Sequence, residues 1–205
     1  MNLINVEEYL EFIYANPLIA NDLPVCELIK KNHDPLGDND IMFLSDLLGV
    51  SRFPNSFIDI IIKYKFNTLC IGNVTFGEIP NTYAYALEWL MALDMHFMTN
   101  YPMECQNLKA HNCIIVAKTK TDVVILNVMN GVVSAVPQDL NLKAELKIAL
   151  TFTDFMNYLV TGVFLNTSKY LHILQNIITS KLGGKSVLFW QSVFPANNSQ
   201  NLPFN

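Results

Sequence analysis

Basic residues are scarce in this 205-residue chain, which has 13 Lys and Arg against 18 Asp and Glu and a formal net charge of −5. Proteins that bind nucleic acids neutralise backbone phosphates with clustered Lys and Arg. We therefore expect no nucleic-acid partner. The acidic balance is instead compatible with a basic protein partner, which the net charge would attract.

The chain also lacks an unbroken apolar run that suits a bilayer. The best candidate, residues 148–165, contains Asp154 and Asn157 near its middle, and an aspartate at a bilayer centre costs about 2.5–3.5 kcal/mol. At the N-terminus, glutamates stand where a signal peptide needs positive charge and then apolar residues. We expect a cytoplasmic protein that does not contact a membrane, with its four cysteines present as free thiols.

Motifs for metal, phosphate or nucleophilic chemistry are incomplete. Cys105, His111 and Cys113 lack the paired C-x2-C spacing and the fourth ligand of a zinc site. The segment LGGKS at 182–186 has Thr179 where a phosphate-binding loop needs its first glycine, and it follows a predicted helix rather than a strand. No serine lies in a G-x-S-x-G setting. We expect no catalytic residue, no metal and no cofactor, although an enzyme with a site assembled from distant residues stays an alternative.

The chain is rich in apolar residues, since 51% of its residues are hydrophobic. Many of these apolar residues recur at regular intervals. Helical spacing predicts helices over residues 6–14, 41–48, 54–64, 83–97, 149–164 and 168–181. Branched-aliphatic runs typical of strands cover residues 68–71, 74–76, 113–118, 122–128 and 132–136. The sequence therefore predicts a mixed helix and sheet protein.

The last three strand runs indicate how the sheet is connected. Asn130-Gly131 separates two of them, and Asn-Gly between strands is a strong hairpin signal. We therefore predict an antiparallel meander and an α+β fold, a single domain with a twisted, mainly antiparallel sheet flanked by helices. Within it we expect an N-terminal helical extension (1–43), a core (44–165), and a C-terminal helix with a polar tail (166–205).

The order of these elements and a set of short motifs are similar to those of a known family. The motifs are Leu48-Gly49-Val50, Phe53-Pro54 with Phe57, Ile61 and Tyr64, residues 66–77, Ile114–Lys118, Val124–Asn127, Asn130-Gly131-Val132, and Thr151-Phe152 with Phe155 and Leu159. Over about residues 44–163 the chain resembles the SUKH superfamily, a group of bacterial immunity proteins and fungal cell-wall regulators.

The resemblance implies a SUKH-like core and a non-enzymatic binding protein. Its leading implication is an immunity protein that neutralises a cognate polymorphic toxin by direct binding, so that the partner is a toxin domain. The fungal relatives imply an alternative, a regulatory scaffold that binds cellular proteins.

Two groups of residues are candidate partner-binding sites. The first lies in a predicted polar loop at residues 30–40 and consists of Asp34, Asp38 and Asp40. The second lies around the start of a predicted helix and consists of Glu78, Tyr83, Tyr85 and Glu88. Acidic loops attract basic partners and tyrosine is enriched at interfaces. The alternative interpretation is a solvated loop and a helix start, where acids favour the helix dipole.

Overall fold

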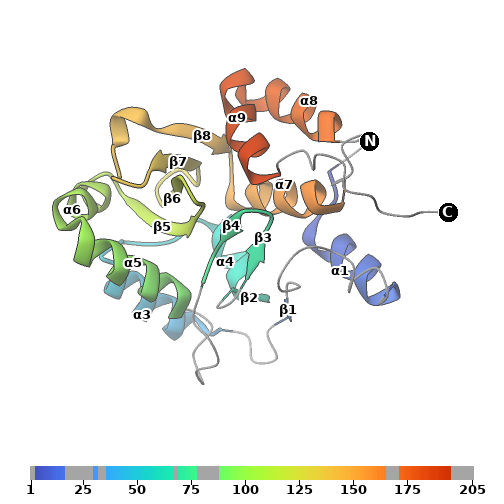
Figure 1. Ribbon diagram of the computed structural model, residues 1–205. Coiled ribbons are helices and arrows are strands. Elements are labelled where there is room, and N and C mark those ends of the chain that lie inside the picture. Colours follow the sequence, from blue (N-terminus) through green and yellow to red (C-terminus); the bar gives the residue numbers. More distant parts are fainter. Residues whose placement is uncertain are drawn as a thin grey trace.

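A curled antiparallel sheet of six strands lies at the centre of the protein (Figure 1). The computed structural model describes residues 3–16, 30–31, 36–66, 69–77, 88–164 and 171–194. The strands follow one another in space as they do in sequence, in the order β3-β4-β5-β6-β7-β8. They are β3 (Cys70–Ile71), β4 (Val74–Thr75), β5 (Cys113–Lys118), β6 (Asp122–Asn127), β7 (Val133–Pro137) and β8 (Leu146–Ala149).

The predicted meander is confirmed as β5, β6 and β7, with every neighbouring pair antiparallel. The second turn of the meander contains the predicted Asn-Gly pair, but only Gly131 adopts a positive φ, of 77°. The Asn130 side chain instead accepts a hydrogen bond from the Val132 N–H at 3.0 Å. The sequence did not predict β8, which extends the meander by pairing with β7. A separate two-stranded sheet joins β1 (Lys30–Lys31) to β2 (Tyr64–Lys65).

Helices surround this sheet (Figure 1). They are α1 (Val6–Ala15), α3 (Asp38–Leu48), α4 (Asn55–Ile61), α5 (Glu88–Asn100), α6 (Pro102–Ala110), α7 (Phe152–Phe164), α8 (Leu171–Leu182) and α9 (Gly184–Val193), with a 3-10 turn at Leu142–Ala144. The sequence predicted neither α6 nor α9. The helix predicted over residues 168–181 ends at Leu182, just before Gly183, which has a φ of 89°, but it is not the last helix, because Gly184 begins α9.

Helix α7 connects the sheet to the N-terminal part of the chain. It packs against α1, α4, β3 and β8. Its predicted apolar face is confirmed, since Phe152, Phe155 and Leu159 are fully buried. The Phe152 ring meets Phe57 of α4 edge-on, with 4.8 Å between the ring centres. An edge-to-face pair of this kind adds about 0.5–1.5 kcal/mol to the effect of burial alone.

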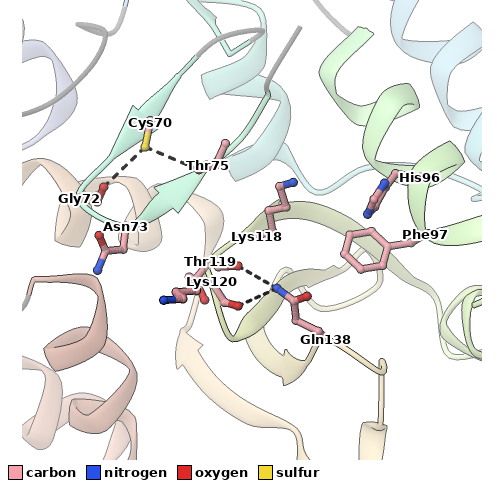
Figure 2. A pocket seen from close by; sticks show the side chains of 10 residues that line it. All are labelled: Cys70, Gly72, Asn73, Thr75, His96, Phe97, Lys118, Thr119, Lys120 and Gln138. Atoms are coloured by element: carbon pink, nitrogen blue, oxygen red, sulfur yellow. Dashed lines mark hydrogen bonds between the residues drawn. The ribbon is translucent and has the colours of Figure 1, made fainter. Parts of the chain in front are cut away.

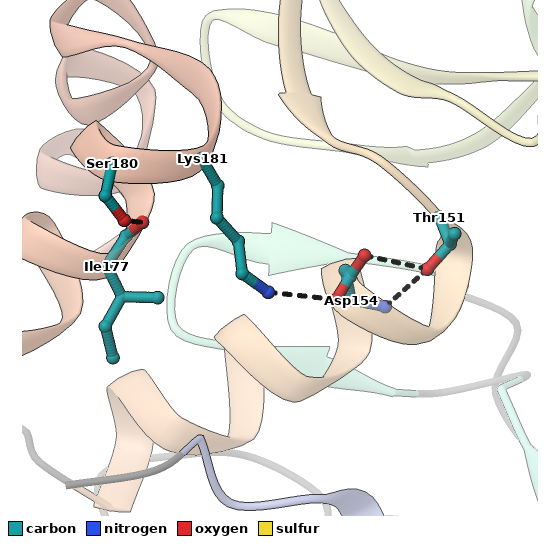
Figure 3. Close-up of polar contacts among 5 residues, drawn as sticks. All are labelled: Thr151, Asp154, Ile177, Ser180 and Lys181. Atoms are coloured by element: carbon teal, nitrogen blue, oxygen red, sulfur yellow. Dashed lines mark hydrogen bonds and ion pairs between the residues drawn. The ribbon is translucent and has the colours of Figure 1, made fainter.

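The start of α7 is fixed by side-chain hydrogen bonds (Figure 3). Thr151, the residue before the helix, accepts a hydrogen bond from the Asp154 N–H at 3.0 Å, and its hydroxyl donates to the Asp154 carboxylate at 3.0 Å. A hydroxyl at this position satisfies one of the free N–H groups of the first helical turn. The same carboxylate lies 3.7 Å from the Lys181 ammonium of α8. Because the pair is partly exposed, we assign it little stabilising free energy.

One hydrophobic cluster runs through the described residues from Val6 to Phe194. The protein therefore has an α+β, single-domain arrangement. Helices α1, α8 and α9 share this cluster with the sheet. The division of the chain at residues 43 and 165 stays a prediction. Among the described helices, none combines the length and the apolar character that crossing a membrane requires.

Candidate functional site

The structure describes three of the seven residues predicted to bind a partner. Asp38 and Asp40 lie in the first turn of α3, and Glu88 is the first residue of α5 as the structure describes it. Asp34, Glu78, Tyr83 and Tyr85 lie outside the described residues. The predicted polar loop is thus shorter than expected, because α3 begins at Asp38 rather than Ile41.

Asp40 has a structural role. Its carboxylate accepts a hydrogen bond from the Gly37 N–H at 2.9 Å, just before the helix begins. Acidic side chains in the first turn also favour the positive end of the helix dipole. For Asp40 the helix-start interpretation is therefore sufficient, and the carboxylate is already engaged. Asp38 is exposed on the same turn.

Helix α3 carries an exposed apolar surface that the sequence did not predict. Met42, Phe43 and Leu47 keep 60%, 66% and 45% of their surface exposed. Residues four apart are neighbours on a helix, so this surface consists of two adjacent rows. We call these six exposed residues the α3 face: Asp38, Met42 and Asp46 in one row, and Asn39, Phe43 and Leu47 in the other.

Charge and apolar character alternate on this face. Asp38 and Asp46 stand one turn before and one turn after Met42, and Phe43 and Leu47 lie beside them. The helix as a whole has three aspartates and no Lys or Arg. The α3 face is therefore an apolar centre flanked by negative charge, which is the surface complement of an apolar patch with a basic rim.

The opposite side of α3 faces the core. Leu44 and Leu48 are buried in the core, and Ser45 donates a hydrogen bond to the Met42 carbonyl at 2.8 Å. At the C-terminal end, Gly49 adopts a left-handed φ of 70°, and the Val50 N–H donates to the Ser45 carbonyl at 2.9 Å. The C-terminal end is thus capped, and the α3 face is presented on a helix rather than on a loop.

A sequence signal for this face did exist. Between Ile41 and Leu48 the chain is apolar on almost every side of the helix, with Met42 and Phe43 adjacent to Ile41 and Leu44. A helix that packs on a core through one face needs only a stripe of apolar residues. The excess of apolar residues indicates either complete burial or an exposed apolar face, and the exposure of Phe43 excludes complete burial.

Thiols and imidazoles do not assemble a reactive centre in the described part of the chain. Cys105 and Cys113 are both buried, and burial raises the pKa of each thiol to about 11. A thiol that stays protonated near neutral pH is a poor nucleophile. The His111 ring nitrogen Nδ1 lies 2.8 Å from the Asn107 carbonyl at the end of α6. Among the described residues there is no group of three metal-ligating side chains.

The segment LGGKS does not have the structure of a phosphate-binding loop. It joins α8 to α9 rather than a strand to a helix, and the Ser186 hydroxyl donates to the Lys147 carbonyl of β8 at 2.7 Å. This hydroxyl ties α9 to the edge of the sheet. In a phosphate-binding loop the corresponding hydroxyl faces a metal-bound phosphate instead.

The buried thiols predict how stability depends on pH. In the unfolded chain these cysteines ionise near pH 9, whereas in the folded protein their pKa is about 11. Because the unfolded state releases these protons first, the free energy of unfolding should fall as the pH rises from about 9 to about 11. Urea titrations across this range would measure the fall. The double variant Cys105→Ala, Cys113→Ala should show a smaller fall, and an equal fall in both proteins would contradict the assignment.

The chain was also compared with known proteins. No protein-family model and no curated protein matches it.

Proposed function

We propose that this protein is a non-enzymatic binding protein of the immunity type, which neutralises a toxin by covering part of its surface with the α3 face. The observation that carries the proposal is the exposure of Met42, Phe43 and Leu47 on a helix whose other side is buried through Leu44 and Leu48. Large apolar side chains grouped on a surface mark binding sites, and methionine and aromatic residues are enriched there.

The charge of the α3 face specifies the chemistry of the partner. Asp38 and Asp46 flank the apolar centre, and the whole chain has a net charge of −5. A partner with an apolar pocket and basic residues around it would bury Phe43 and pair with both aspartates. Opposite net charges would also accelerate the encounter of the two proteins. Nucleases and other toxins that act on anionic substrates are basic for their own function, so they offer such a surface.

The architecture supports the same proposal. An antiparallel sheet preceded by α4 and closed by α7 is compatible with the SUKH resemblance of residues 44–163. Phe57 and Ile61 of α4, which carry part of that resemblance, are core residues here. They are therefore core residues, and the proposal assigns binding to surface residues.

Co-expression with the product of the adjacent gene tests this function. We expect that product to arrest growth when it is expressed alone, and we expect the present protein to restore growth and to co-purify with it. Co-purification without an effect on growth would favour a regulatory scaffold over an immunity protein. If the two proteins do not co-purify and growth is not restored, the proposal is contradicted.

A further inference from the structure

Both turns of the meander are held by side-chain hydrogen bonds. At the β5–β6 turn, the Thr119 hydroxyl accepts a hydrogen bond from the Asp122 N–H at 2.9 Å. The Gln138 amide donates to the Thr119 carbonyl at 3.1 Å (Figure 2). This turn borders a pocket of about 470 Å³, which His96 and Lys118 also line. The β6–β7 turn is held in a comparable way, but it contains two neighbouring residues that can react with each other.

These two residues are Asn130 and Gly131, which lie between β6 and β7 and form a pair that occurs once in the chain. Asn130 is exposed, whereas Gly131 is buried. An asparagine followed by glycine is prone to spontaneous deamidation, because glycine has no side chain to hinder the approach of its backbone nitrogen to the asparagine side chain. The hairpin signal in the sequence is therefore also a candidate site of covalent modification.

Deamidation begins when the Gly131 backbone nitrogen, after losing its proton, attacks the side-chain carbonyl carbon of Asn130. A C–N bond forms and closes a cyclic imide. The bond from the same carbon to the side-chain nitrogen breaks, and this nitrogen takes up a proton and leaves as ammonia. Water then opens the imide to aspartate or isoaspartate. The reaction needs water alone, so its rate depends on whether the Gly131 nitrogen is free to lose its proton and attack.

In the folded protein this nitrogen is engaged and covered. The Gly131 N–H donates a hydrogen bond to the Asn127 carbonyl at 2.8 Å. A Cβ added to Gly131 would lie 3.6 Å from the Pro54 side chain, so the residue before α4 packs against the turn here. A buried, hydrogen-bonded N–H exchanges its proton with water only when the structure opens locally. Loss of the Gly131 proton therefore requires the β6–β7 turn to open.

Asn127, the last residue of β6, holds the turn closed through several of its atoms. Its side-chain oxygen accepts hydrogen bonds from the N–H groups of Met129 and Asn130, at 3.0 and 3.2 Å. Its backbone N–H donates to the Val132 carbonyl at 2.9 Å, and its side-chain amide donates to the His111 carbonyl at 3.3 Å. Asparagine side chains stabilise turns in this way, because their oxygen replaces a backbone acceptor. Loss of this side chain should loosen the turn and leave the reactive pair itself unchanged.

We propose that Asn130 is a site of spontaneous deamidation, and that the closed β6–β7 turn, held by Asn127, limits its rate. The product adds a negative charge to a chain whose net charge is −5. Isoaspartate also lengthens the main chain by a carbon atom, which does not fit the hydrogen bond between the Asn127 N–H and the Val132 carbonyl. An opening of the turn would thus be recorded as a permanent change in the protein. The site is independent of the α3 face and of the proposed function.

Peptide mass spectrometry measures the reaction, because conversion of an amide to an acid changes the mass of the peptide that contains Asn130. The unaltered protein is incubated folded and in concentrated urea, at the same mildly alkaline pH and the same temperature. We expect Asn130 to deamidate at least about tenfold more slowly in the folded protein, the equivalent of 1.4 kcal/mol for opening the turn. Equal rates in the two states, or no reaction in urea, would overturn the proposal.

Three variants test the role of Asn127. Asn127→Ala removes the acceptor of two N–H groups of the turn, so Asn130 should deamidate about fivefold faster in the folded variant. Asn127→Asp keeps a side-chain oxygen in this place and should react at nearly the rate of the unaltered protein. Asn141→Ala is the matched control, because the Asn141 side-chain oxygen also accepts a backbone N–H, from Lys143 at 3.1 Å, but at the 3-10 turn. It should leave the rate at Asn130 unchanged.

Amide hydrogen exchange in the unaltered protein gives an independent test if Asn127→Ala does not fold. Measured by NMR, the Gly131 N–H should exchange at least about tenfold more slowly than in an unfolded chain, because it exchanges only from the open turn. Three results would contradict the role of the turn. These are exchange of the Gly131 N–H at the unfolded rate, equal rates at Asn130 in Asn127→Ala and Asn141→Ala, and an Asn127→Asp protein that reacts as fast as Asn127→Ala.

Discussion

Phe43→Ser is expected to weaken the complex with the partner protein by about 30-fold or more. Phe43 is 66% exposed at the centre of the α3 face, so the change removes a large apolar contact without opening a cavity in the core. Central aromatic residues of an interface cost about 2 kcal/mol or more when truncated, and 1.4 kcal/mol is a factor of ten in affinity. Titration calorimetry of the two proteins would measure the change.

Leu188→Ser is the matched control for this experiment. Leu188 is 67% exposed on α9 and lies outside the α3 face, so its substitution removes a similar exposed apolar side chain. Both variants should unfold at the same urea concentration as the unaltered protein. Equal affinity of the Phe43 variant and the unaltered protein would show that the partner binds elsewhere.

The second large effect is expected at Gly162, where α7 meets the residue after α9. A Cβ added to Gly162 would overlap the ring of Phe194, and a Cβ added to Gly72 would lie 2.8 Å from the same ring. Phe194 is thus inserted between two glycines, with only 2% of its surface exposed. Gly162→Ala should lower the free energy of unfolding by about 2 kcal/mol, because overpacking costs about 1–3 kcal/mol.

The effect should change sign when Phe194 is removed. Phe194→Ala alone should cost about 3–5 kcal/mol, as other buried aromatic truncations do. In that background the three nearest atoms that the new methyl group would meet are removed, and alanine is favoured over glycine inside a helix by about 1 kcal/mol. Gly162→Ala should therefore stabilise the Phe194→Ala protein. Urea unfolding of the four proteins measures the cycle, and the same loss in both backgrounds would contradict this packing.

The sequence predicted the helices and strands that have strong apolar periodicity, and it missed β8 and α9 for separate physical reasons. The meander and the buried face of α7 were correct because each carries a long, regular apolar pattern. Strand β8, Leu146–Ala149, runs into the helix predicted over residues 149–164, so its apolar residues were not separated from the helical pattern. Helix α9 begins at the second of two glycines that are ordinarily a helix stop, and it is held by tertiary contacts such as the hydrogen bond from the Trp190 indole N–H to the Ile148 carbonyl.

The sites were less predictable than the fold. Asp38 was predicted as a partner-binding residue and lies on the α3 face, but its apolar neighbours Met42 and Phe43 were taken into account only as part of a helix. Apolar periodicity identifies a helix without showing which of its apolar residues remain exposed, because exposure depends on what packs around it. A pocket lined by His96, Lys118 and Gln138 could not be predicted at all, since these residues are far apart in sequence.

The most direct measurement of the central claim is the oxidation rate of individual methionines by dilute peroxide, with and without the partner. Met42 of the α3 face and Met103 of α6 are both well exposed, at 60% and 71%. Peptide mass spectrometry reports both in the same sample, so Met103 serves as an internal control. If the α3 face binds the partner, Met42 is protected in the complex and Met103 oxidises as before. Unchanged oxidation of Met42 in a saturated complex would contradict the proposed surface.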